Sequence, residues 1–340
     1  MANARDYIPA FFHGHQVYPQ NMILPNMPLE GGKVWFVDGD KSTGGAGATW
    51  EDAFVTLVAA EAAASAGDVI FVAAKTMAKT DTDPGSYTEN LTIDTPQLSI
   101  IGVSRGRTQG GLPQIKVGST TTQAIIRVRA PGVLIMNLGI NGVSATGGGI
   151  RFDDNGGTTY ASFGGSVIGC HFKNCKGTTA TNAATGGAIQ LSGAPWQMYF
   201  GGNRFYKNVG DIAILDTSTS APQDIVIEDN AFSGPATSVD CNIYTGGSGV
   251  ASGLVIRNNT FEGLPNITSG TNKQFLMLTG STGILADNTF AASTAEGGSE
   301  ETFGATANNL VPTTVFMARN FGEFSTGVGA GLVSGEIFRT

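Results

Sequence analysis

A short phrase that repeats along the middle of the chain constrains the fold more than any other feature. The phrase is a few apolar strand residues followed by Asn-x-Phe, and its phenylalanines recur every 27 to 33 residues. Repetition at a fixed period of this size is the signature of a solenoid. Full copies occupy residues 199–205, 226–232, 255–261 and 284–290, with a variant carrying Cys170 at 167–172 and a shortened copy at 319–321.

A second apolar triplet lies between the copies. It appears at residues 150–152, 189–191, 212–214, 241–243 and 275–277. Each repeat therefore contains at least two short strands joined by polar, Gly-rich turns. A strand this short cannot bury its apolar face alone, but parallel stacking at about 4.8 Å satisfies both its backbone and its core. The sequence thus predicts a coil of parallel strands with the phenylalanines stacked inside.

The repeated asparagines have two interpretations. At a turn, an Asn amide can bond the backbone and the Asn one rung away, and Asn tolerates a left-handed backbone. This predicts a structural ladder. The alternative is a row of amides that binds sugar. The residues concerned are Asn203, Asn230, Asn259 and Asn288.

Composition narrows the class of protein. Gly provides 49 of 340 residues, which fits a β-rich chain with many tight turns. The formal net charge of -8 argues against nucleic acid as a partner, because phosphate backbones attract basic surfaces. We find no apolar run of membrane-spanning length and no signal-peptide pattern, and so expect no membrane span.

Three cysteines at irregular spacing, Cys170, Cys175 and Cys241, are expected to be small buried hydrophobes in a protein made in a reducing compartment.

Residues 1–31 differ from the rest of the chain. They are rich in apolar side chains and contain four prolines, which disfavour a long helix and favour an extended path. An apolar extended arm needs a surface to lie on. That surface is either another subunit, which we favour, or the chain's own solenoid. The residues expected to make the contact are Tyr7, Ile8, Phe11, Phe12, Tyr18, Met22, Ile23 and Leu24.

A helix is predicted shortly after the arm. Residues 34–37 form a short apolar strand, and Thr49 precedes acidic residues that suit the first turn of a helix. Phe54, Leu57 and Val58 would share one face. An Ala-rich run through Ala66 would continue the helix to Gly67, and residues 68–72 resume a strand.

The apolar strand 34–37, the helix signal and the strand 68–72 together resemble the capped N-terminal end of pectin-lyase-like β-helix proteins, and the Asn-x-Phe rungs resemble the body of that family. The resemblance covers residues 33 to 324. It implies an all-β fold, a right-handed parallel β-helix (solenoid) with a short N-terminal capping helix and an extended N-terminal arm. The expected division is an arm at 1–31, a strand plus capping helix at 32–67, the parallel β-helix at 68–324 and a C-terminal tail or cap at 325–340. The fold alone does not assign a function.

Catalytic signals are weak. A polysaccharide lyase of this family would carry an acidic calcium cluster beside a basic residue, yet the arginines are scattered. A glycosidase needs two carboxylates about 5–9.5 Å apart, but carboxylates at strand ends are also ordinary turn formers. The arginines are Arg127, Arg129, Arg151 and Arg257, and the carboxylates are Asp153, Asp154, Asp211, Asp216, Asp224, Glu228 and Asp229.

Three further candidates carry weaker signals. His13 and His15 would point the same way in an extended segment and could chelate a metal. Asp38-Gly39-Asp40 resembles the start of a calcium loop but lacks the later ligands. Trp196 could stack on a sugar ring or pack in the protein. We assign no catalytic residue, no metal and no cofactor.

The arm decides between the functions that the family offers, because it resembles the docking arms of phage virion proteins. We expect a structural virion protein, made in the host cytoplasm, that docks through its N-terminal arm onto capsid or tail subunits, and we favour a role without catalysis. By analogy it forms a homo-oligomer, with a trimer as the favoured form. Two alternatives stay open: a carbohydrate-active tailspike or depolymerase (a glycoside hydrolase or polysaccharide lyase), and a non-catalytic glycan-binding adhesin. The tail at 325–340 either covers the open end of the coil or serves as a second contact surface.

Overall fold

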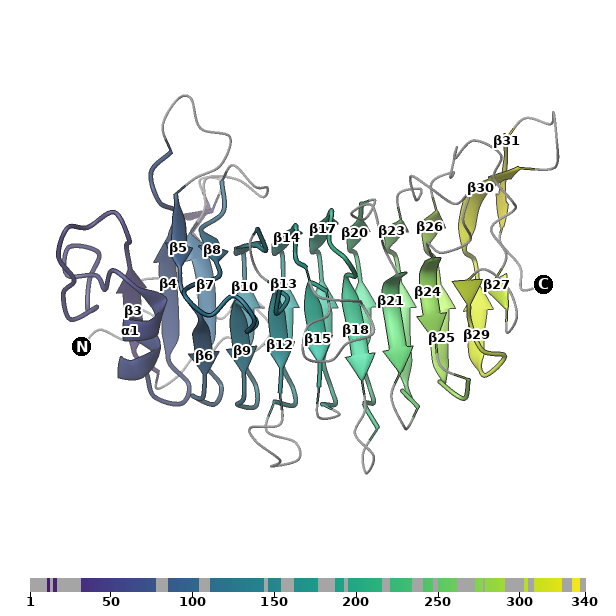
Figure 1. Ribbon diagram of the computed structural model, residues 1–340, viewed down its shortest axis with the longest axis horizontal. Helices are drawn as coiled ribbons and strands as arrows, with labels where there is room; N and C mark the ends of the chain where they lie inside the picture. Colours follow the sequence, from purple (N-terminus) through teal and green to yellow (C-terminus); the bar gives the residue numbers. More distant parts are fainter. Residues whose placement is uncertain are drawn as a thin grey trace.

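The chain forms a right-handed parallel β-helix, as the repeats and the family resemblance together indicate. The computed structural model describes residues 11–12, 15–16, 32–77, 85–103, 111–143, 146–153, 162–176, 187–192, 195–215, 221–233, 241–246, 250–261, 273–277, 279–290, 303–304, 309–325 and 332–336. Three long sheets run side by side along the molecule, from β3 at one end to β29 at the other (Figure 1). From β4 to β24 each turn of the chain adds one strand to each sheet, and the strand pairs between these turns are parallel.

The first sheet comprises β3 (Val34–Val37), β4 (Val69–Ala73), β7 (Ser99–Val103), β10 (Leu134–Met136), β13 (Ser166–Ile168), β16 (Tyr199–Gly201), β19 (Val226–Glu228), β22 (Leu254–Arg257), β25 (Gly283–Ala286) and β29 (Val315–Ala318). The second comprises β5 (Ser86–Thr88), β8 (Gln114–Lys116), β11 (Gly139–Asn141), β14 (His171–Lys173), β17 (Arg204–Tyr206), β20 (Ala231–Phe232), β23 (Thr260–Phe261), β26 (Thr289–Phe290), β30 (Phe321–Ser325) and β31 (Leu332–Glu336). The third comprises β6 (Leu91–Ile93), β9 (Ile126–Val128), β12 (Ile150–Phe152), β15 (Ile189–Leu191), β18 (Ile212–Leu215), β21 (Cys241–Gly246), β24 (Lys273–Met277), β28 (Asn309–Leu310) and β27 (Phe303–Gly304).

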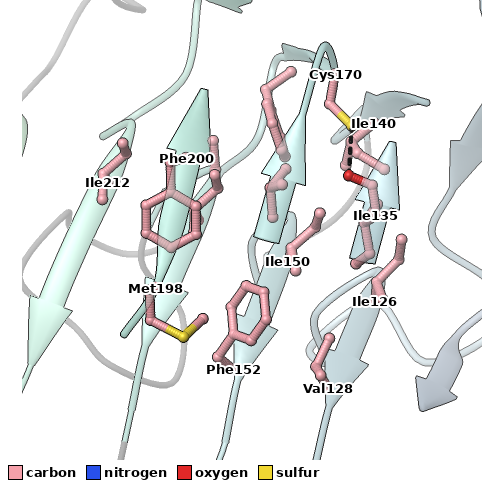
Figure 2. Packing of buried hydrophobic residues seen from close by; sticks show 14 of the residues in the cluster. Ile126, Val128, Ile135, Ile140, Ile150, Phe152, Cys170, Met198, Phe200 and Ile212 are labelled. Carbon is pink, nitrogen blue, oxygen red and sulfur yellow. Dashed lines mark hydrogen bonds between the residues drawn. The ribbon is translucent and has the colours of Figure 1, made fainter. Parts of the chain in front are cut away.

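One continuous apolar core fills the space that the three sheets enclose. Figure 2 shows Ile126, Ile150 and Phe152 of neighbouring strands directed into this space. All three cysteines are free and buried, as expected, and Cys170 and Cys175 belong to this core. Burial raises the pKa of the Cys170 thiol to about 12, so it stays protonated and behaves as a small hydrophobe.

The repeated phenylalanines stack inside the coil, which confirms the sequence prediction. Adjacent ring centroids lie 4.6 to 5.1 Å apart and the ring planes differ by less than 10°. This distance matches the spacing of neighbouring strands, because each rung contributes one ring at the same register position. The stacked residues are Phe172, Phe205, Phe232, Phe261 and Phe290.

The repeated asparagines form the predicted structural ladder. In each rung the Asn backbone N–H donates to Oδ1 of the next Asn at 2.9 to 3.2 Å. The side-chain Nδ2 donates to a carbonyl of the preceding rung at 2.8 to 3.0 Å. Every amide is buried, so a row of amides that binds sugar is excluded at this position. The ladder comprises Asn203, Asn230, Asn259, Asn288 and Asn320.

The residue with a left-handed backbone in this turn is not the ladder Asn, contrary to the expectation from the sequence. It is the residue before each ladder position, for example Asn258 with φ 55° and Asp287 with φ 58°, rather than the ladder Asn itself. Earlier rungs place Gly169 and Gly202 there. This is reasonable because Gly, Asn and Asp adopt positive φ at the lowest cost.

The shortened last copy explains an exposed aromatic ring. Asn320 continues the ladder, but Phe321 follows it directly instead of after one intervening residue. A shift by one residue turns a strand side chain to the opposite face. Gly322 therefore pairs with Phe290, while Phe321 pairs with Thr289 on the outer face and is 51% exposed.

The capping helix begins later than the sequence indicated. Helix α1 spans Leu57–Ala63, and its N-cap is Thr56, whose side chain accepts from the Ala59 N–H. The prediction of a start at Thr49 and an end at Ala66 was wrong. Leu57 and Val58 do not share one face as predicted, since Leu57 is buried and Val58 is 46% exposed. The preceding segment instead bonds to the backbone of β3 through the pairs Phe36 N–H to Gly47 O and Phe54 N–H to Phe36 O.

Different elements lie at the two ends of the solenoid. Leu57 and Ala60 of α1 pack on the core beside β3, so the helix covers the first end (Figure 1). At the other end β31, within the predicted tail, pairs antiparallel with β30 and extends the second sheet. The first sheet ends at β29 among the described strands. No helix in the described part of the chain is long and apolar enough to cross a membrane.

Candidate functional site

The N-terminal arm is described only in part. Phe11 and Phe12 form β1 (Phe11–Phe12), which pairs antiparallel with β2 (His15–Gln16). The other predicted contact residues lie outside the described residues, and docking through the arm therefore stays a prediction. They are Tyr7, Ile8, Tyr18, Met22, Ile23 and Leu24.

The candidate metal pair, His13 and His15, does not have the geometry on which it was based. Phe12 and His15 are register partners in an antiparallel pair, so the chain reverses between them. The rule that residues i and i+2 of an extended segment point the same way does not apply across a reversal. His13 lies outside the described residues. Within the described ranges, no group of three His, Cys, Asp or Glu side chains is placed to hold a metal ion.

The remaining small motifs are structural. Asp38 accepts from the Asp40 N–H at 3.0 Å, and Asp40 accepts from the Thr76 N–H at 2.6 Å, which fixes a turn. The Trp196 ring stacks on Phe163 with centroids 4.8 Å apart and planes 9° from parallel. This contact favours packing over sugar stacking for Trp196.

Asp153 is the strand-end carboxylate with the richest surroundings. It follows β12 and is 2% exposed. Arg127 donates to it from the neighbouring strand β9 at 2.6 Å, and the Arg151 Nε lies 3.4 Å away. Because two guanidinium groups hold one buried carboxylate, the arrangement is an ion-pair cluster that ties adjacent rungs together. Asp154 and Asp216 lie outside the described residues.

Asp211 lies inside the solenoid. It accepts from Asn208 Nδ2 at 2.9 Å and from Asn242 Nδ2 at 2.6 Å. Burial raises the pKa of this carboxyl to about 7, although the two amide donors oppose the shift. A group enclosed on the inner side of the coil is closed to a polymeric substrate.

The other carboxylates take part in surface ion pairs and turns. Glu228 accepts from Arg257 Nε at 2.6 Å and from the Tyr199 hydroxyl at 2.9 Å. Asp224 and Asp229 occupy left-handed turn positions, with φ of 56° and 57°. These contacts support the interpretation that carboxylates at strand ends are ordinary structural groups here.

The outer face of the first sheet carries the surface feature that sequence reasoning missed. One register position of this sheet points outward along the whole molecule, opposite the inward row that includes Ile100 and Ile135. Near the α1 end of the solenoid, the residues at this outward position are covered, since Val69 and Leu134 are fully buried. Toward β29 the residues at this position are exposed to solvent. We define the exposed apolar row as Val226, Val255, Ile284 and Phe316, four residues in direct register on β19, β22, β25 and β29.

Exposure increases along the row. Val226 and Val255 are half-buried, Ile284 is 45% exposed and Phe316 is 65% exposed. Large apolar side chains that gather on an exposed face mark interaction sites. A signal for the row was present in the sequence, because each copy carries an apolar doublet such as Val255-Ile256 instead of one apolar residue. Periodicity cannot show which member of a doublet points inward.

Comparisons with known proteins give a limited result. No family model matches the chain, and no curated protein matches it. Among solved structures, a pectin methylesterase from Aspergillus niger is 14% identical, with 86% of each chain covered and a TM-score of 0.44. Pectate lyase Pel9A is 10% identical, with 85% of this chain and 79% of that chain covered and a TM-score of 0.46. ORF18 of Geobacillus virus E2 is 12% identical, with 88% of this chain and 63% of that chain covered and a TM-score of 0.43. Similarity at this level gives no basis for assigning an activity to this chain.

Proposed function

We propose that this chain is a structural protein of a phage particle, made in the host cytoplasm, that docks through its N-terminal arm onto capsid or tail subunits. The observation that carries the proposal is the state of the described carboxylates. Asp153 is buried between two arginines, Asp211 is enclosed in the core and Glu228 is ion-paired. These three carboxylates, which a glycosidase could use for acid and base chemistry, are thus occupied by structural contacts.

The composition of the arm supports docking. Residues 1–31 combine apolar side chains with four prolines, and this combination suits an extended segment held on a surface. Burial of an apolar-rich segment against another surface is favourable, because it removes apolar side chains from water. A solenoid that presents a regular face and an anchoring arm suits a decorating or stabilising part of a particle.

The arm is tested by co-sedimentation with particles assembled from the shell and tail proteins encoded with this chain. We expect the full chain to co-sediment, and expect a chain lacking residues 1–31 to remain in the supernatant. The double variant Phe11→Asp, Phe12→Asp should also lose binding, because charged side chains resist burial. A truncated chain that co-sediments as well as the full chain would show that docking does not use the arm.

A separate assay addresses catalysis. Incubation with host surface polysaccharides should release no new reducing ends and no unsaturated sugars. If product appears, Asp153→Asn is compared with Asp94→Asn, a matched variant whose carboxylate pairs with Arg129 on the surface. Product that disappears only in Asp153→Asn would overturn the proposal in favour of a carbohydrate-active enzyme.

A further inference from the structure

We infer that the exposed apolar row binds the same row on a second copy of this chain. The inference concerns a different surface from the arm and does not depend on arm docking. The row presents four apolar side chains on successive strands, and the largest of them, Phe316, is also the most exposed.

The spacing of the row favours a second copy as the occupant. Neighbouring rungs are about 4.8 Å apart, so the side chains of the row are evenly spaced at that interval. A helix presents its contacts with a different period, a pitch of about 5.4 Å, and drifts by about 2 Å over four contacts. Another copy of the same solenoid repeats at the same interval, so every contact along the two rows can be made at once. Contact between identical patches is also the usual arrangement in symmetric oligomers.

The charges beside the row do not oppose this contact. On the strands of the row itself, Glu228 and Arg257 pair within the chain at 2.6 Å. On the adjoining turn, Asp287 and Arg319 pair at 2.7 Å. A partner selected by charge would meet a surface of one sign. These pairs present both signs together, so the part of the row from Val255 to Phe316 can meet the same part of a second copy without a run of like charges. The exposed Asp224 and Asp229 lie beyond that part, in the turns on either side of β19.

The small size of the exposed apolar row indicates that two copies associate weakly. Four rungs span only about 15 Å, and specific stable interfaces bury about 800 Å² on each partner. The outer face at the first end adds nothing, because Val69 and Leu134 are already covered. We therefore expect association that increases with protein concentration rather than a permanent dimer.

The first test compares Phe316→Asp with Phe321→Asp in the full chain. Both residues are exposed phenylalanines near the same end, but Phe321 faces outward from the second sheet. In sedimentation velocity over a concentration series, the native chain and Phe321→Asp should show the same rise in mass, and Phe316→Asp should remain a monomer at all concentrations. A native chain that stays monomeric, or equal behaviour of the two variants, would overturn the inference.

The second test uses cysteine cross-linking, since the three native cysteines are buried. Val255→Cys and Ile284→Cys place a thiol on the row, and Thr260→Cys and Thr289→Cys place one on the same rungs in the second sheet. Mild oxidation should give a covalent dimer from at least one variant of the row and from neither Thr variant. Equal cross-linking of all four variants, or none in the row, contradicts a contact through this face.

Discussion

The ladder asparagines show how much a single buried amide does in this fold. Asn259 accepts from both nitrogens of Asn230 and donates to Ile227 O and Asn288 Oδ1. Removal of the amide leaves several buried groups without partners, at a cost of about 1–3 kcal/mol for each group. We predict that Asn259→Ala lowers the free energy of unfolding by about 3 kcal/mol or more, measured by urea denaturation. The exposed neighbour Thr260→Ala should change it by less than about 0.5 kcal/mol, and equal effects would contradict the role of the ladder.

Asp211 gives the protein a pH dependence at the scale of one residue. Its pKa is about 7 in the folded chain, against an ordinary value of 3.8. Between these values the folded state keeps a proton that the unfolded state has released, so stability falls as pH rises from about 4 to about 7. In Asp211→Asn this dependence should be lost, because Asn does not titrate and the Asn242 amide can turn its Oδ1 toward it. Thermal unfolding of both proteins across this pH range measures the difference; a slope that persists in the variant would assign the dependence to other groups.

At the scale of the element, the rung was predictable because local and global signals agree. Asn-x-Phe fixes the turn, the inward ring and the period together, so the ring stack followed from spacing, and the structural ladder was one of the two interpretations that the asparagines allowed. The helix was harder. Thr49 carries a valid capping signal, but the segment after it pairs with β3, and tertiary hydrogen bonds outweigh a local preference. The acidic first turn expected after Thr49 is replaced by Glu89, which is distant in sequence and accepts from the Leu57 and Val58 N–H groups.

The two threonines provide a direct comparison of predicted and observed helix starts. Thr56→Ala removes the side chain that accepts from the Ala59 N–H and should cost about 1 kcal/mol. Thr49→Ala removes only an exposed turn contact to the Asp52 N–H and should cost less than about 0.5 kcal/mol. Denaturant midpoints of the two variants check the order. A larger loss in Thr49→Ala would place the true helix start at the earlier residue.

The candidate sites depended on register, which the sequence leaves undetermined. Arg127 and Asp153 are far apart in the chain and meet because β9 and β12 are neighbours with Arg127 opposite Arg151. The exposed apolar row has the same origin, since only the stacking of β19, β22, β25 and β29 aligns its members. Composition could indicate that such residues exist, but not which of them share a face.

At the scale of the whole molecule, the solenoid separates its surfaces by position. Helix α1 lies at one end and β29 near the other (Figure 1). The core is continuous, and the apolar part of the outer face is exposed toward β29. The arm joins the covered end, at β3. The proposed contacts with particle subunits and with a second copy thus start from different parts of the chain and can be separated by experiment.

The solution mass of three proteins tests this account most directly: the full chain, the chain lacking residues 1–31 and Phe316→Asp, each followed by light scattering over the same concentration range. The account predicts that the truncated chain keeps the mass of the full chain, because the arm serves a different partner, and that Phe316→Asp is a monomer. A truncated chain that becomes monomeric while Phe316→Asp keeps the full mass would contradict the account, since the arm would then join like subunits and the exposed apolar row would not.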